Sequence, residues 1–329
     1  MQRSLIVLLT AVIVSIPAAG AERKVYFLLQ NQFSAADVAS LQIEKGVSIS
    51  GSSLCWKKGD SVEKALSYTA TDIEAVFASA VKSIGIVDHP GTCIVLDLEH
   101  PVHPKEFHGL GGTMNAVVAA FANRIRIARK QLPRSKLALY GILNPQPQGE
   151  YTEEFIRQFA ALRSAGKLGM YDDIDYIVPV LYTRFGSNDS ERQRSGWEHY
   201  IRMGLEASSL MVCSDGNPVP LAPILSSRVL NGGSRNEYDP VPADAMKKIL
   251  AILAEYESVH AVLFWEGWDG YPLKPGEASM EIKGAGGTRT IYPLDMEKYF
   301  RSISPADIMT GARSRHHDIP APLKIIVEQ

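Results

Sequence analysis

The residues best suited to chemistry are two acids, Asp97 and Glu99, at the end of the apolar run Val95-Leu96-Asp97-Leu98-Glu99. Side chains alternate along a strand, so a strand here places both carboxylates on one face. Two adjacent carboxyl groups in a pocket do not both ionise cheaply, and one keeps its proton near neutral pH. A protonated carboxyl is the group that protonates a glycosidic oxygen. The structural alternative is an acidic pair that caps a loop or pairs with arginine.

Further aromatic and polar residues follow other apolar runs of the sequence. Aromatic planes stack on the apolar faces of sugar rings, whereas sugar hydroxyls need polar partners. Each aromatic alone is more often part of a core, but their shared place at the ends of predicted strands favours a carbohydrate site. We therefore predict substrate contacts from Tyr140, Asn144, Tyr182, Arg184, Arg228, Trp265, Glu266, Trp268 and Asp269.

The elements that must position these residues alternate between strands and helices. Strands are expected at residues 24–29, 46–50, 92–98, 136–143, 174–182, 218–226 and 259–265. Helices are expected at residues 61–84, 113–131, 152–167, 190–205 and 241–256. Such alternation predicts parallel strands with right-handed crossovers. We predict an α/β fold, a single-domain TIM-like barrel of seven or eight β/α units, whose site lies at the carboxyl ends of the strands. An open doubly wound sheet is the alternative.

The chain begins with a segment typical of a secretory signal. Arg3 is followed by an apolar run of 12 residues, too short to span a bilayer, and by Ala19-Gly20-Ala21. We predict a signal peptide at 1–21, a barrel catalytic domain at 22–301 and an irregular tail at 302–329. The protein is then secreted or periplasmic, with no stable membrane insertion after cleavage; an uncleaved anchor is the alternative.

The composition narrows the class of partner. With 34 basic and 36 acidic residues, the net charge is −2, which offers no concentrated basic surface for nucleic acid. Three cysteines are too few for a disulfide scaffold, although a bridge between Cys55 and Cys213 stays open. A polysaccharide is the expected partner, and nothing in the sequence requires a metal or another cofactor.

The ordered set of motifs resembles the hyaluronidase family of glycoside hydrolases, and more loosely other barrel enzymes that act on N-acetylhexosamine sugars. The likeness rests on Asp97-Leu98-Glu99, Tyr140-Gly141, Pro179-Val180-Leu181-Tyr182, the proline-rich strand before Arg228, and Phe264-Trp265. It departs where the family has Trp and this chain has His100-Pro101, and the family's usual disulfides have no counterpart.

The resemblance implies a seven-stranded barrel and a retaining, substrate-assisted endo-N-acetylhexosaminidase reaction. Glu99 would be the general acid/base, while Asp97 would orient the acetamido group of the substrate and tune Glu99. Tyr182 would hold that group and Trp265 would form a pocket wall. Arg228 is carried over on weaker grounds.

Two other functions fit the same sequence. One is a metal-dependent polysaccharide deacetylase, because His89, His100, His103 and His108 lie around the Asp97 strand and imidazoles with a carboxylate can bind zinc. Prolines at 101 and 104 keep His100 and His103 off one helical face, so loop histidines are the simpler interpretation. The other is a non-catalytic carbohydrate-binding protein of the cell envelope on the same fold.

Overall fold

The computed structural model describes residues 23–28, 41–141, 169–183, 191–229, 239–265, 279–284, 287–291 and 294–311. The predicted signal segment and the predicted helix at 152–167 lie outside these residues. Seven parallel strands form one sheet in the order β5-β4-β3-β2-β1-β7-β6. They are β1 (Lys24–Phe27), β2 (Ile43–Ser50), β3 (Thr92–Asp97), β4 (Lys136–Tyr140), β5 (Tyr176–Val178), β6 (Ile224–Leu225) and β7 (Ala261–Phe264).

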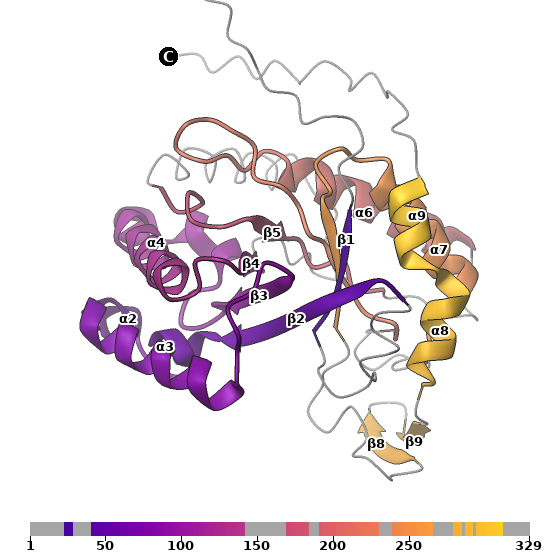
Figure 1. Cartoon of the computed structure of the whole chain (residues 1–329), viewed down its shortest axis with the longest axis horizontal. Helices are drawn as coiled ribbons and strands as arrows, with labels where there is room; N and C mark the ends of the chain where they lie inside the picture. The colour runs from indigo at the N-terminus through magenta and orange to yellow at the C-terminus, as the bar shows by residue number, and fades with distance from the viewer. Residues whose placement is uncertain are drawn as a thin grey trace, which may run out of the picture.

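The two edges of this sheet also meet. Parallel bridges join Ile177 to Leu221 and Val180 to Ile224, which brings the β5 segment beside the β6 segment. The sheet therefore curves into a nearly closed barrel with helices on its outside (Figure 1). The predicted single-domain TIM-like barrel is confirmed, and the open sheet is excluded.

The helices between the strands are α2 (Val62–Ser67), α3 (Ala70–Ile84), α4 (Met114–Gln131), α6 (Glu191–Ser208) and α7 (Ala243–Ala254). Short 3-10 turns accompany them at η1 (Gly51–Leu54), η2 (Pro104–Gly109) and η3 (Gly111–Thr113). The single helix expected at 61–84 is wrong, because Tyr68 is extended and Thr69 starts a new helix. The Thr69 side chain accepts from the backbone N–H of Asp72, whose carboxylate accepts from the Thr69 N–H.

Several strands are shorter than their apolar runs predict. The run at 218–226 contributes only Ile224–Leu225, and the run at 174–182 only Tyr176–Val178. Prolines at 179, 218, 220 and 223 lack the N–H that a continuous ladder needs. Isolated bridges hold the rest of both segments in the wall of the barrel.

Alternating side chains give the barrel two apolar layers. One row on each strand points into the barrel and the other packs under the helices. The outer layer includes Ile94, Leu96, Ile177, Val262 and Phe264. The interior is filled by Tyr26, Leu28, Cys93, Val95, Ala138, Tyr176, Val178, Val180, Ala222, Ile224, Ala261 and Leu263.

The C-terminal part corrects the expectation of an irregular tail from residue 302. Helix α8 (Met296–Ile303) is followed by α9 (Pro305–Gly311), which lies against α7 on the outside of the barrel (Figure 1). Buried Ala306 and Met309 hold α9, and the Met309 carbonyl accepts from the Arg23 guanidinium. Residues 312–329 lie outside the described part.

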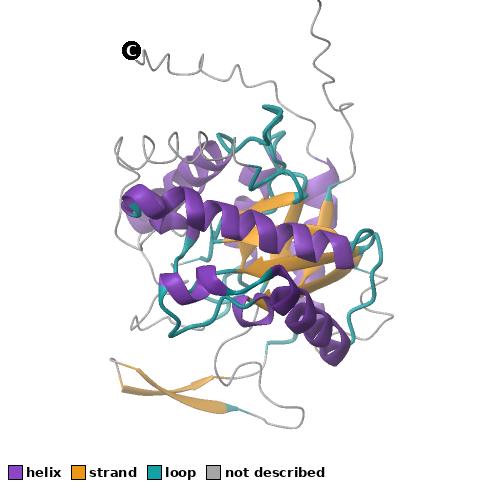
Figure 2. Ribbon diagram, turned by 90° about the vertical axis from the view of Figure 1, so that its left-hand side faces the viewer, coloured by secondary structure: helices purple, strands orange, loops and turns teal. Residues whose placement is uncertain are grey.

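A separate antiparallel hairpin, β8 (Met280–Gly284) and β9 (Gly287–Ile291), stands away from the barrel in both views (Figure 2). Among the described residues, no helix combines the length and the apolar character needed to cross a lipid bilayer.

Candidate active site

The interior rows of four strands end in residues that the sequence predicts for the site. These rows are apolar over most of their length and change to polar or aromatic side chains at the carboxyl end. Because the strands are parallel, their carboxyl ends meet at one end of the barrel. The final members of the rows are Asp97 on β3, Tyr140 on β4, Tyr182 after β5 and Trp265 after β7.

Asp97 and Glu99 lie on the same side of the chain, as the alternation predicts. Leu98 between them is fully buried in the outer layer, whereas both acids keep partial contact with solvent. Asp97 Oδ1 is buried and has no hydrogen-bond partner among the described residues. Burial, and next the charge of Glu99, raise the pKa of Asp97 to about 7. The pair can therefore hold a proton close to neutral pH.

Two tyrosines and a tryptophan form an aromatic wall beside the acids. The Tyr140 and Tyr182 hydroxyl oxygens are 3.4 Å apart. The Tyr182 ring stacks on Trp265 with centroids 5.4 Å apart and planes at 23°. Burial raises the pKa of Tyr182 well above its usual value, and the Tyr140 hydroxyl and the charges of Asp97 and Glu99 raise it further. Tyr182 therefore stays a neutral phenol that can donate a hydrogen bond.

His103 is the neighbour of Glu99 that the sequence does not single out. Its Nε2 lies 3.5 Å from Glu99 Oε1, and its side chain is 8% exposed where that of Glu99 is 36% exposed. The sequence interpretation treats it as one of several loop histidines. The spacing of four residues from Glu99 is the only available signal, and by itself it is weak. By contrast, His100 is exposed.

Arg228 is placed differently from the other predicted contacts. It follows β6, is only 2% exposed, and its backbone N–H donates to Ser226 Oγ. So small an exposed fraction leaves little surface for a ligand. The predicted contacts Asn144, Arg184, Glu266, Trp268 and Asp269 lie outside the described residues.

The histidines and cysteines of the sequence leave a metal centre and a disulfide open. Within the described ranges, no three His, Cys, Asp or Glu side chains are grouped as a metal ion requires, and the His108 side chain is outside them. Cys55, Cys93 and Cys213 are all free thiols, so the Cys55–Cys213 bridge is not formed.

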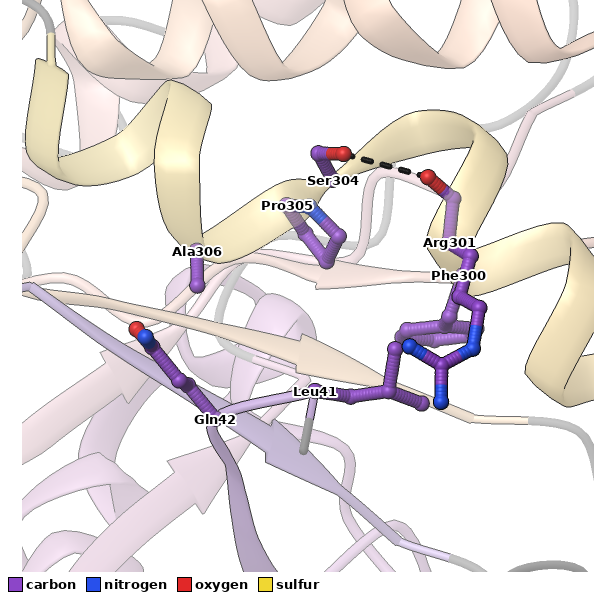
Figure 3. A pocket seen from close by; sticks show the side chains of 7 residues that line it. All are labelled: Leu41, Gln42, Phe300, Arg301, Ser304, Pro305 and Ala306. Atoms are coloured by element: carbon purple, nitrogen blue, oxygen red, sulfur yellow. Dashed lines mark hydrogen bonds between the residues drawn. The ribbon is translucent and has the colours of Figure 1, made fainter. Parts of the chain in front are cut away.

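A hollow of about 240 Å³ lies elsewhere, against the outside of the barrel (Figure 3). It is next to the amino-terminal end of β2, whereas Asp97 is at the carboxyl end of β3. Its lining consists of Leu41, Gln42, Phe300, Arg301, Ser304, Pro305 and Ala306, and includes none of the predicted site residues. Arg301 pairs with Glu297 on its own helix.

These features define a class: a (β/α) barrel with a carboxyl pair and an aromatic wall at the carboxyl end of its strands. No protein-family model matches the sequence, and no curated protein matches it. Bee venom hyaluronidase is similar in structure, with a TM-score of 0.51 and 10% identity over 74% of this chain and 91% of that chain.

Other solved structures are similar at lower scores. A GH18 chitinase from Pseudoalteromonas aurantia has a TM-score of 0.38 and 12% identity over 74% of this chain and 93% of that chain. Xylanase 10B from Thermotoga maritima has a TM-score of 0.36 and 12% identity over 88% of this chain and 96% of that chain. At these identities a structural likeness establishes the fold alone. Of these three structures, bee venom hyaluronidase is the one similar enough to support the fold assignment. The chain thus shares the barrel fold of bee venom hyaluronidase.

Proposed function

We propose that the protein is an exported glycoside hydrolase that cleaves polysaccharides containing N-acetylhexosamine, with retention of configuration. The observation that carries the proposal is the meeting of Asp97, Glu99, Tyr140, Tyr182 and Trp265 at one end of the barrel. Two carboxyl groups supply proton transfer, and the aromatic wall supplies the surface on which a sugar ring stacks. The likeness to bee venom hyaluronidase supports the same barrel.

Glu99 is the general acid in this proposal because it is the more accessible acid of the pair. Its side chain is 36% exposed, so a glycosidic oxygen can reach it, while one Asp97 oxygen is buried. Because the pKa of Asp97 is raised to about 7, the pair holds a proton near neutral pH, and Glu99 is the member that delivers this proton to the glycosidic oxygen. The protonated pair thus avoids two adjacent negative charges.

The reaction then uses the substrate's own acetamido group as the nucleophile. The acetamido oxygen attacks the anomeric carbon as the glycosidic C–O bond breaks, and the Glu99 proton passes to the departing oxygen. Asp97 and the neutral hydroxyl of Tyr182 orient the acetamido group. Water next attacks the cyclic intermediate from the face that the leaving group vacated, Glu99 takes its proton, and the acetamido group is restored.

Release of reducing ends tests the proposal directly. The protein without residues 1–21 is incubated with hyaluronan, chondroitin, chitin oligomers and peptidoglycan, beside Glu99→Gln and Asp97→Asn. Glu74→Gln is the matched control, because Glu74 is a half-exposed acid on α3 that pairs with the surface residue Lys130. We expect cleavage of one polymer, its loss in Glu99→Gln by about 100-fold or more, and native activity in the control.

Activity that survives in Glu99→Gln would exclude Glu99 as the acid. Absence of cleavage across the panel would overturn the proposed substrate class. Acetate release under those conditions, sensitive to a chelator, would instead indicate a deacetylase, and saturable sugar binding without turnover would indicate a non-catalytic binder.

A further inference from the structure

The loop after β3 holds His103 in a fixed place. Just before it, the Val102 carbonyl accepts from Trp56 Nε1 at 3.3 Å. Just after it, Phe107 is fully buried and packs edge-on against Phe121 of α4, with centroids 5.0 Å apart. Both anchors belong to the outer core, so the loop between them is tied to the body of the barrel.

The backbone of His103 is itself held by η2. Its carbonyl accepts from the Glu106 N–H at 2.8 Å, and its N–H donates to Glu106 Oε2 at 3.4 Å. These two reciprocal contacts close the turn that starts η2. The imidazole therefore extends from a rigid backbone.

The end of β4 also lies close to the His103 ring. Gly141 follows β4 with φ of +81°, and a Cβ added there would lie 2.8 Å from Cε1 and 2.9 Å from Nε2 of His103. Only a residue without a side chain permits this approach. The ring thus lies close to both Gly141 and the carboxyl of Glu99, with 3.5 Å from Nε2 to Oε1.

We propose that His103 is a positioning residue of Glu99, whose imidazole N–H holds the carboxyl in the orientation that proton transfer requires. The proposal rests on the proposed function. A distance of 3.5 Å is longer than a good hydrogen bond, and such contacts commonly shorten when substrate binds. When Glu99 gives up its proton, the Nε2–H of His103 donates to the carboxylate that remains and stabilises it. This hydrogen bond weakens again when Glu99 takes a proton from water.

The described residues around this contact include further titratable groups. Asp97 of β3 and the Tyr182 hydroxyl interact with Glu99, Tyr140 contacts the Tyr182 hydroxyl, and Glu106 lies on η2. Loss of the imidazole removes the His103 N–H from a carboxyl that lies next to these acidic neighbours. The Glu99 carboxyl should then keep its proton to higher pH.

Substitution of His103 tests this role with a built-in rescue. The Gln side chain in His103→Gln reaches about as far as Nε2 and offers an N–H that does not titrate, whereas His103→Leu offers none. His89→Gln is the control, because His89 is exposed and lies before β3, at the opposite end of that strand from Glu99. For each variant, kcat, KM and the pH profile are measured on the polymer that the native protein cleaves.

We expect His103→Leu to lower kcat by about 10- to 100-fold with KM within about threefold of native. The basic limb of its profile should move to higher pH, while His103→Gln recovers most of kcat. A purely structural role predicts no movement of that limb and equal damage by both substitutions. Native kcat in His103→Leu, or no recovery in His103→Gln, would overturn the proposal.

Failure of the proposed function gives a different result, because the native protein would then cleave none of the polymers. In that case the carboxyl carbon of Glu99 is titrated by NMR, with its signal assigned by Glu99→Gln. A midpoint that His103→Leu moves to higher pH keeps His103 as the group that holds the Glu99 carboxyl. An unchanged midpoint refutes that assignment without reference to activity.

Discussion

Asp97 is expected to lower the stability of the native protein as the pH rises towards neutrality, and Asp97→Asn is expected to remove this penalty. Below about pH 4, native and unfolded chains both carry the proton, and Asp97 contributes nothing. Between about pH 4 and pH 7, the unfolded chain releases the proton while the native chain keeps it. Ionisation of Asp97 stabilises the unfolded state but not the native state in this range. The free energy of unfolding therefore falls as the pH rises.

The raised pKa of Asp97 sets the size of the effect. The pKa rises from its usual value of 3.8 to about 7, a change of about three units. Each unit corresponds to about 1.4 kcal/mol, so the penalty reaches about 4 kcal/mol above pH 7. Part of the increase in the pKa of Asp97 comes from the charge of Glu99, so Glu99→Gln should lower the midpoint of the Asp97 titration. Burial is the larger cause, so the midpoint should stay above the usual value for aspartic acid.

Denaturant unfolding at several pH values between 4 and 8 measures this quantity. The free energy of unfolding of Asp97→Asn minus that of the native protein should grow by as much as about 4 kcal/mol across this range. Glu74→Gln should show no comparable trend. A difference that is constant between pH 4 and pH 8 would refute the argument that Asp97 keeps its proton in the native state.

Two further substitutions test the packing around the site. Gly141→Ala should lower the free energy of unfolding by at least about 2 kcal/mol, because the new Cβ would meet the His103 ring. Gly216→Ala is the control, because Gly216 has a similar φ of +87° but open space around it, and it should cost only about 1 kcal/mol. Arg124→Met should cost about 3 kcal/mol or more, because the buried guanidinium donates to four backbone carbonyls. Arg126→Met removes only an exposed pair with Asp173 and should cost less than about 1 kcal/mol. Equal losses within either pair, measured by denaturant unfolding, would contradict these assignments.

The barrel and the acid pair are predictable from the sequence because both depend on local alternation. The run from Cys93 to Glu99 places one set of side chains inside and the other under the helices, and no distant residue is needed to infer this. Lengths of elements are less predictable. Thr69 divides a continuous helical pattern because its side chain and that of Asp72 cap each other, and prolines before β6 remove ladder donors.

The position of α9 depends on contacts that no local pattern contains. Its sequence begins with Pro305 and has only seven residues, so it would be marginal as an isolated helix. It is stabilised by burial of Ala306 and Met309 against the barrel and by a bond from Arg23, which is 286 residues away in the chain. The contact of His103 with Glu99 is not predictable for the same reason, since Gly141 and Glu99 approach His103 only in the folded chain.

The interior rows of the barrel connect stability with chemistry. Along β3, the interior row consists of buried Cys93, buried Val95 and then Asp97. Packing alone would favour an apolar residue at position 97. An acid whose buried oxygen has no hydrogen-bond partner in the described part of the chain costs stability at that position. The same desolvation raises the pKa of Asp97 to about 7 and so gives the pair a proton in the neutral range. A substitution that stabilises this end of the barrel by removing the Asp97 carboxyl should therefore also remove the group whose raised pKa helps the pair to hold a proton near neutral pH.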